Sequence, residues 1–175
     1  MSRPVLEVSM AYSASTVANF FIDKASSEGR AVTPMQLIKL VYIAHGWHLG
    51  YFSKPLINET VQAWRYGPVV KSLYDKVKRY GSGAVSEPVQ TTSVPWSRDT
   101  LDAQTQSLLD SVWSAYAGFS GIQLSAMTHQ LDTPWYEAWH LQGGSSQYFA
   151  EISDDVIERH YKQKISQSRP EAALA

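Results

Sequence analysis

The segment from Met35 to Tyr51 constrains the fold more than any other, because a helix over these residues is apolar on almost every side. A helix of that kind is buried at the centre of its domain. Its far side carries only a thin stripe of Lys39, Gly46 and Gly50. The two glycines would let another backbone approach closely. At helical spacing, one apolar face carries Leu37, Leu40, Val41, Ala44 and His48, and the adjoining face carries Ile38, Tyr42, His45 and Leu49.

The rest of the pattern predicts more helices and little β structure. Ser13 is placed to cap a helix that ends near Ser27, and Thr33 followed by Pro34 is a start signal for the central helix. Further helices are expected at about 68–80, 101–117, 120–131, 134–139 and 153–164. The segment TVQAWRY favours a strand and predicts a small β element at about residues 60–66. We therefore expect a mainly α fold, a single compact helical domain around a buried central helix.

A chain of 175 residues is about one domain long, and it shows no internal repeat. We expect the helical domain to cover residues 13–165. Residues 1–12 are expected to form a flexible N-terminus, and residues 166–175 a flexible C-terminal tail. A polar loop with Gly, Ser and Pro, at residues 81–98, is expected to carry at most some irregular β structure.

Composition argues against several classes of protein. The formal net charge of -1 gives no overall attraction for nucleic acid. The absence of cysteine excludes disulfides, thiolate metal ligands and thiol nucleophiles. No window supplies the ~20 consecutive apolar residues of a membrane span, and the first residues lack the apolar core of a secretory signal. We expect a cytoplasmic protein that does not associate with membranes.

The histidines are the candidates for chemistry. His45 and His48, three apart on a helix, could share a metal, but such a site needs further ligands. His129, His140 and His160 could supply them only if the fold brought them together, and the sequence has no HExxH motif and no clustered acid. It also has no nucleophile elbow, Walker-type loop or dinucleotide-binding turn. We therefore expect no catalytic residues, no metal site and no cofactor, with a small hydrolase using His45, His48 or His129 left as an alternative.

A set of short motifs resembles one known family. The motifs are Lys39, Leu40 and Tyr42; Gly46, Trp47 and His48; Lys54 to Leu56; Ala63 to Val69; Thr128 and His129; and Pro134 and Trp135. Together they resemble the Panacea domain of SocA-like antitoxins, a family that also includes phage-associated proteins. The resemblance covers about residues 14–162.

The resemblance implies a function that composition cannot indicate. Members act as antitoxins that neutralise a cognate protein toxin by direct contact, and one type also delivers its toxin to a Clp-type protease. It further implies a non-enzymatic protein and a setting in a prophage or in phage defence. Some relatives carry an added helix-turn-helix region that binds DNA. Only about a dozen residues precede the domain here, so direct DNA binding is not expected.

The motif residues themselves are interpreted as structural. Gly67 and Pro68 suit a turn between strand and helix, and the tryptophans Trp47, Trp64, Trp135 and Trp139 are expected in the core with partners for their N–H groups. His48 and His129 are expected to join helices through hydrogen bonds. The full structural set is Gly46, Trp47, His48, Trp64, Gly67, Pro68, Thr128, His129, Pro134 and Trp135.

The candidate binding surface is the polar face of the expected helix at 68–80, with the residues just before it. Its members are Arg65, Tyr66, Lys71, Tyr74, Asp75, Lys78 and Arg79, and Lys76 lies on the same face. A polar helix face is often simply solvated. A second alternative is a nucleic-acid-binding regulator that uses residues 71–79 as a basic recognition helix. The favoured hypothesis is a surface that docks an acidic toxin, with exposed tyrosines as anchors.

Overall fold

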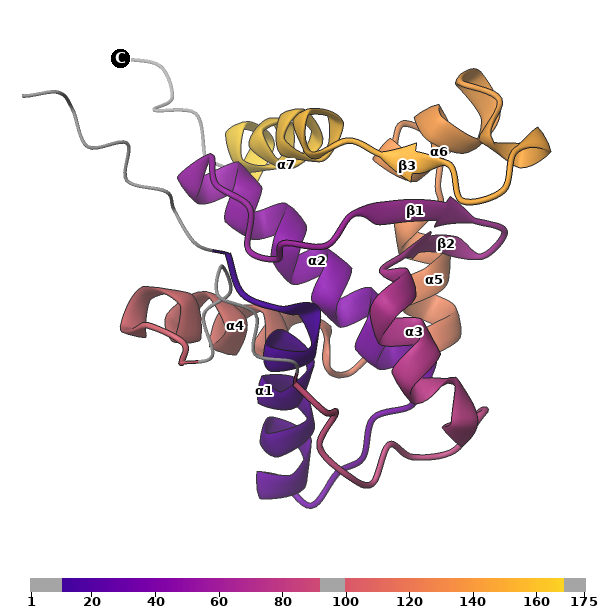
Figure 1. Cartoon of the computed structure of the whole chain (residues 1–175). Coiled ribbons are helices and arrows are strands. Elements are labelled where there is room, and N and C mark those ends of the chain that lie inside the picture. Colours follow the sequence, from indigo (N-terminus) through magenta and orange to yellow (C-terminus); the bar gives the residue numbers. More distant parts are fainter. Residues whose placement is uncertain (1–10, 92–99, 169–175) are drawn as a thin grey trace, which may run out of the picture.

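In the computed structural model, which describes residues 11–91 and 100–168, seven α-helices pack together, and a small sheet lies at one side of them (Figure 1). The helices are α1 (Ala14–Ser27), α2 (Pro34–Phe52), α3 (Lys71–Val77), α4 (Ala103–Tyr116), α5 (Gly121–Thr128), α6 (Pro134–Tyr136) and α7 (Asp154–Ser168). The strands are β1 (Val61–Trp64), β2 (Gly67–Val69) and β3 (Glu151–Ile152). The expected mainly α fold is confirmed.

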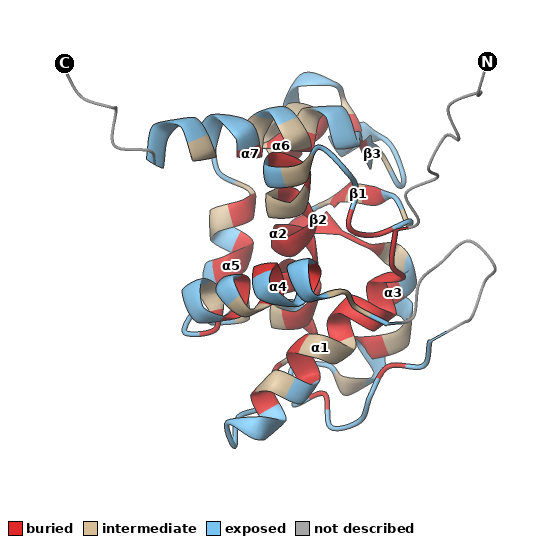
Figure 2. Ribbon diagram, turned by 90° about the vertical axis from the view of Figure 1, so that its left-hand side faces the viewer, coloured by how far each residue is buried: buried red, intermediate tan, exposed pale blue. Residues whose placement is uncertain are grey.

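Helix α2 runs through the middle of the molecule, as its all-round apolar pattern predicts. It packs against α1, α4, α5 and α7, and Figure 2 shows it almost entirely buried. Thr33 caps its start by accepting a hydrogen bond from the backbone N–H of Gln36, whose side chain accepts one from the Thr33 N–H. The helix ends at Ser53, which adopts a left-handed conformation with φ 55°.

The stripe of small residues on α2 is where α7 crosses it. A Cβ atom added to Gly46 would lie 2.1 Å from the ring of Tyr161, and one added to Gly50 would lie 2.9 Å from the Tyr161 Cβ. Tyr161 is itself only 4% exposed. The two glycines therefore permit close packing of α7 against α2, as the sequence indicates.

The sheet has the order β2-β1-β3, with both pairs antiparallel. The β element expected at 60–66 is therefore present, but the prediction that Pro68 opens a helix is wrong. Pro68 lies in β2, where it pairs with Ala63, and α3 begins only at Lys71. Proline tolerates this position because β2 is an edge strand and needs no N–H there.

The two ends of the expected domain differ from their predicted boundaries. Tyr12, assigned to the flexible N-terminus, is 3% exposed and forms a parallel bridge with Ile57. Helix α7 continues to Ser168, beyond the expected limit at 164. The rest of the expected flexible ends, at 1–10 and 169–175, and residues 92–99 of the expected loop lie outside the described residues.

Across the described residues, helices long and apolar enough to cross a membrane are absent.

The α2–α7 contact yields a stability prediction. Gly46→Ala should lower the free energy of unfolding by about 1–3 kcal/mol, because the overlap with the Tyr161 ring outweighs the ~1 kcal/mol gain in helix propensity. Gly118→Ala is the matched control, since a Cβ there meets no atom within 4 Å. Urea denaturation of both variants checks this. Equal stability of the Gly46→Ala and Gly118→Ala proteins would contradict the close packing.

Candidate protein-interaction surface

The hairpin of β1 and β2 is held from inside by Ser125 and by two residues of the recognised motifs. The indole N–H of Trp135 donates to the Trp64 carbonyl at 2.5 Å. The Ser125 hydroxyl donates to the Tyr66 carbonyl at 2.5 Å, and the ammonium of Lys39 donates to the Pro68 carbonyl at 2.9 Å. Three helices therefore fix the hairpin at every second carbonyl from Trp64 to Pro68.

Lys39 is an unusual part of this anchor because it is only 2% exposed. Removal of its ammonium from water lowers its pKa to about 7. Gly67 leaves space for the Lys39 ammonium, because an added Cβ would lie 2.9 Å from the Lys39 Nζ and 3.2 Å from the Thr128 Oγ1. The φ of Gly67 is 115°, a backbone conformation that glycine adopts readily and other residues rarely do. The motif residues Lys39, Gly67 and Thr128 thus meet at one buried point.

His45 is a buried structural contact rather than an open catalytic base in this fold. It is fully buried, and its Nε2 lies 2.8 Å from Asp154 Oδ1. Its Nδ1 accepts hydrogen bonds from the backbone N–H groups of Leu56 and Ile57 at 3.3 and 3.4 Å. Both ring nitrogens are therefore engaged. Asp154 could not be predicted as the partner of His45, since the two lie more than a hundred residues apart in the sequence.

The other two motif histidines do not join helices, so that prediction is wrong. His48 Nδ1 lies 2.5 Å from the Lys54 carbonyl, in the turn that follows its own helix. His129 ends α5, packs against Trp135 at 5.3 Å between ring centroids, and its buried Nδ1 has no hydrogen-bond partner. Within the described ranges, no three His, Asp or Glu side chains are grouped so that they could hold a metal ion.

The expectation that all four tryptophans lie in the core is only partly confirmed. Trp135 is 4% exposed, whereas Trp47, Trp64 and Trp139 are partly buried at the edge of the core. The N–H group of Trp47 donates to the Tyr116 hydroxyl at 3.1 Å, and that of Trp64 donates to the Gln62 side chain at 2.9 Å.

The charged residues of α3 and of the 3-10 turn η1 (Lys78–Tyr80) that follows it, together called the α3 charges below, are partly neutralised. Asp75 forms ion pairs with both Lys71, at 2.6 Å, and Lys78, at 3.3 Å, and these contacts lower its pKa. Arg79 lies 3.5 Å from Glu87. The surface is therefore less basic than the sequence of α3 suggests.

Lys76 was expected on the same face, but its ammonium makes hydrogen bonds to other parts of the protein. Its ammonium donates to the Ser15 hydroxyl and to the Gln90 carbonyl, both at 2.9 Å. These contacts tie α3 to the start of α1, so Lys76 is part of the scaffold.

Exposed aromatic side chains adjoin these charges. Tyr66, at the hairpin tip, is 60% exposed, Tyr148 is 94% exposed and Phe149 is 53% exposed. Tyr148 and Phe149 were not among the predicted site residues; β3 brings them beside β1 through the hydrogen bond from the Ala63 N–H to the Ala150 carbonyl. No local pattern could have placed them there, because the pairing spans about half of the chain.

Aromatic and cationic groups alternate within this region. The Lys71 ammonium lies 5.8 Å from the centre of the Phe149 ring, and the Arg65 guanidinium lies 5.5 Å from that of Tyr66. The Trp64 ring joins Tyr74 to Phe149, with centroid distances of 4.9 and 6.3 Å. We name this region the hairpin surface, consisting of Arg65, Tyr66, Lys71, Tyr74, Asp75, Lys78, Arg79, Tyr148 and Phe149.

Phe149 is held in a strained backbone conformation. Its φ is 58°, in the left-handed region that a bulky side chain rarely adopts. Such a conformation costs about 1–3 kcal/mol and persists where the surrounding structure imposes it, often at functional sites. Strain at a half-exposed aromatic residue makes Phe149 the strongest single indication of a contact site on this surface.

Comparisons with known proteins agree with the motif resemblance. Residues 37–136 match the family model described as antitoxin SocA-like, Panacea domain. The chain is also 28% identical to Antitoxin SocA from Caulobacter vibrioides (strain NA1000 / CB15N), in an alignment that covers 95% of this chain and 92% of that protein. No solved structure matches the chain significantly. The matched segment contains most of α2, the hairpin and α3.

Lys39 yields a prediction on pH. The ordinary lysine pKa of 10.5 applies in the unfolded chain and a pKa of about 7 in the folded one, so folding must expel a proton between these values. The free-energy cost of burying the charged ammonium is therefore largest below pH 7, and it decreases as the pH rises. The stability of the parent relative to Lys39→Met should therefore grow by roughly 1 kcal/mol per pH unit above pH 7. Urea denaturation between pH 7 and pH 9 measures the difference, and parallel pH profiles would contradict a neutral buried lysine.

Proposed function

The chain belongs to the SocA-like antitoxin family with a Panacea domain, and from this membership we propose that it neutralises a cognate protein toxin by binding it directly through the hairpin surface. The observation that carries the surface assignment is the exposed aromatic group formed by Tyr66, Tyr148 and Phe149 beside the cations of α3. The proposed site of action is the cytoplasm.

The composition of the surface supports a protein partner. Aromatic residues and arginine are enriched at protein interfaces, and a few such residues carry most of the binding energy. Tyr148 and Phe149 supply large apolar area that water covers in the free protein. Charges at the edge of an interface mainly speed association and set specificity. The cations of α3 would therefore steer an acidic toxin surface toward the aromatic anchors.

The anchoring of the hairpin supports a preorganised site. Trp64, Tyr66 and Pro68 are each held through their carbonyl groups by buried partners from α6, α5 and α2. A surface fixed in this way loses little conformational entropy on binding. The side chains at the hairpin tip remain exposed, so they are available to a partner.

The alternatives gain less support from the same residues. Helix α3 has only seven residues, and Asp75 offsets the charge of two of its lysines, which weakens the case for a nucleic-acid recognition helix. For a hydrolase, His45 offers no free nitrogen to a substrate. A protein partner accounts better for the exposed aromatic residues.

The first experiment tests the antitoxin activity. The product of the neighbouring reading frame is expressed alone and together with this chain in a bacterial host. We expect growth arrest from the neighbour alone and rescue on co-expression. A neighbour that is not toxic, or toxicity that co-expression never relieves, would contradict the proposed function.

The second experiment tests the hairpin surface with variants that keep the fold. Tyr148→Ala combined with Phe149→Gly should weaken toxin binding by at least tenfold, on the order expected for anchor residues. The free energy of unfolding should change by less than about 1 kcal/mol, because glycine relieves the strained backbone while the lost side chains are exposed. Calorimetric binding and urea denaturation measure the two quantities.

Charge reversal tests the α3 residues separately. Lys71→Glu, Lys78→Glu and Arg79→Glu together should slow association about tenfold at low salt, with a smaller effect at high salt. The matched control reverses Lys24, Lys54 and Lys162, three cations on other elements. Unchanged rescue and binding by the folded α3 variant at both salt concentrations would reject the surface, while the antitoxin proposal would stand.

The same co-expression distinguishes binding from removal of the toxin. In neutralisation by binding, the toxin level measured by immunoblot stays constant while growth recovers. A fall in the toxin level that depends on a host Clp-type protease would instead indicate the adaptor role seen in one type of relative.

A further inference from the structure

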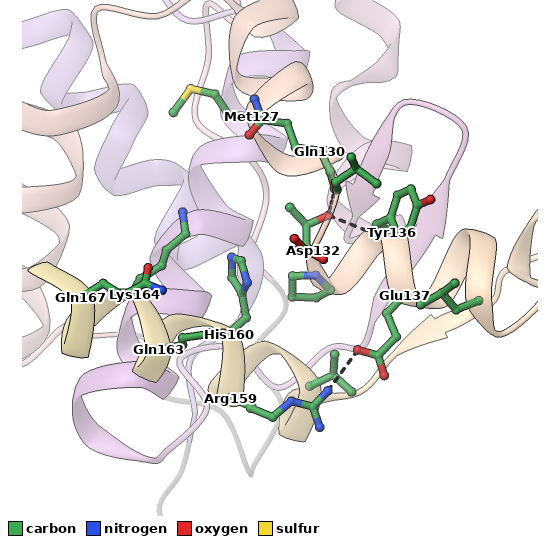
Figure 3. Close-up of a pocket in the computed structure, with 15 residues that line it drawn as sticks. Met127, Gln130, Asp132, Tyr136, Glu137, Arg159, His160, Gln163, Lys164 and Gln167 are labelled. Atoms are coloured by element: carbon green, nitrogen blue, oxygen red, sulfur yellow. Dashed lines mark hydrogen bonds and ion pairs between the residues drawn. The ribbon is translucent and has the colours of Figure 1, made fainter.

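A second region of the surface is hollowed into a groove that the family function does not account for. The groove has a volume of about 620 Å³ and lies between α7 on one side and the end of α5 with α6 on the other (Figure 3). In Figure 2, α5 and α3 lie on opposite sides of α2. The groove is therefore separate from the charged face of the hairpin surface.

One wall of the groove is a continuous face of α7. Val156, Arg159, His160, Gln163, Lys164 and Gln167 line it, at the spacing of successive turns on one side of a helix. From Val156 to Gln167 this wall is about 16 Å long, given a rise of ~1.5 Å per residue. That length matches about five residues of extended chain at ~3.3 Å each.

The opposite wall and rim mix apolar and polar side chains. The apolar ones are Met127, Leu131, Pro134 and Leu141, and the polar ones are Gln130, Asp132, Thr133, Tyr136 and Glu137. Leu131 and Leu141 are 70% and 71% exposed. Exposed leucines around a concave site mark a place where an apolar side chain can be covered.

One ion pair crosses the groove. Arg159 of α7 lies 3.0 Å from Glu137 of the π-helical turn η2 (Glu137–Leu141), as Figure 3 shows. This pair compensates both charges and links the two walls at that position. Arg159 is therefore not free to bind a ligand anion.

Lys164 is the cation of the groove that lacks a carboxylate partner among the described residues. Its ammonium lies 5.5 Å from the centre of the Tyr161 ring. Although the residue as a whole is exposed, the surrounding side chains withdraw water from the ammonium and lower its pKa. His160, which lines the groove beside it, also has its pKa lowered by burial. An anion bound next to Lys164 would stabilise the charged ammonium and so offset the cost of its partial removal from water.

The groove continues inward to a cavity of about 20 Å³, which has room for one water molecule. Tyr42 and Tyr161, exposed by 1% and 4%, line this cavity together with His160 and Lys164. Burial raises the pKa of both phenols, so both hydroxyls stay protonated at neutral pH. The two phenols that line this cavity are therefore hydrogen-bond donors.

We propose that this groove binds a short, extended peptide segment of a partner protein, in which an apolar side chain lies next to a carboxylate. The apolar side chain would cover Met127 and Pro134 between the two exposed leucines, and the carboxylate would face Lys164. Gln130, Gln163 and Gln167, which line the groove, each offer a donor and an acceptor for the peptide backbone. The site does not depend on the toxin assignment.

A phage library of random heptapeptides, selected on the full chain, tests the groove. We expect enriched peptides to carry Asp or Glu beside a large apolar residue. A synthetic copy of the strongest peptide should bind Lys164→Glu at least tenfold more weakly in fluorescence anisotropy. A selection repeated on Lys164→Glu should lose the acidic preference. Leu131→Asp with Leu141→Asp should also weaken binding, without loss of fold, since both side chains are exposed.

Lys162→Glu is the matched control. Lys162 lies on the same helix but outside the groove, where it contacts Ser53 and Glu158, so this variant should bind the peptide as the parent does. Failure to enrich any peptide, or equal binding by Lys164→Glu, would overturn the proposal.

Two further measurements exclude other occupants. A variant ending at Ser168 that binds peptides which the full chain rejects would show that this chain's own last residues fill the groove. A dimer in sedimentation that dissociates on Leu131→Asp would show that a second copy fills it. Either result would overturn a peptide of another protein as the occupant.

Discussion

The burial of α2 on all sides is the constraint on which the rest of the structure depends. An apolar helix of this length can be covered only if other helices pack around it, and α1, α4, α5 and α7 do so. Its few polar groups then determine how the neighbours attach. Lys39 holds the hairpin because its ammonium donates a hydrogen bond to the Pro68 carbonyl, and His45 holds α7 through its contact with the Asp154 carboxylate. Because an unpaired buried polar group costs about 1–3 kcal/mol, each of these contacts selects one arrangement of the neighbouring element.

This arrangement explains why residues that are distinctive in the sequence lie inside the protein. Gly67 leaves space for the Lys39 ammonium, and Trp135 holds the Trp64 carbonyl. Such residues specify where the hairpin lies, while the side chains that point outward from it are free to vary with the partner. The fold therefore separates the positions that build the scaffold from those that can meet a toxin. A substitution at an exposed position of the hairpin can therefore leave the core intact.

The sequence predicted what depends on local patterns and failed where distant residues meet. The spacing of apolar residues predicted α2 and its central position, and the Thr33–Pro34 signal predicted where it begins. The start of α3 was wrong because Pro68 suits an edge strand as well as a helix start, and only the pairing with Ala63 decides between them. Asp154 beside His45 and Phe149 beside Lys71 could not be foreseen, because each contact joins residues many elements apart. The charge of α3 was overestimated for a different, local reason: Asp75 pairs with Lys71 and Lys78, and Glu87 reaches Arg79 from the following loop.

The hairpin surface and the groove are joined through one short helix. Pro134 lines the groove, and the next residue, Trp135, is buried and donates its indole N–H to the hairpin. Close-packed elements of this kind move as a unit rather than deform continuously, so the two surfaces are held at a fixed distance from one another. A partner can carry two binding segments joined by a linker. Binding of one segment raises the effective concentration of the other only when the linker spans the fixed distance between the two surfaces.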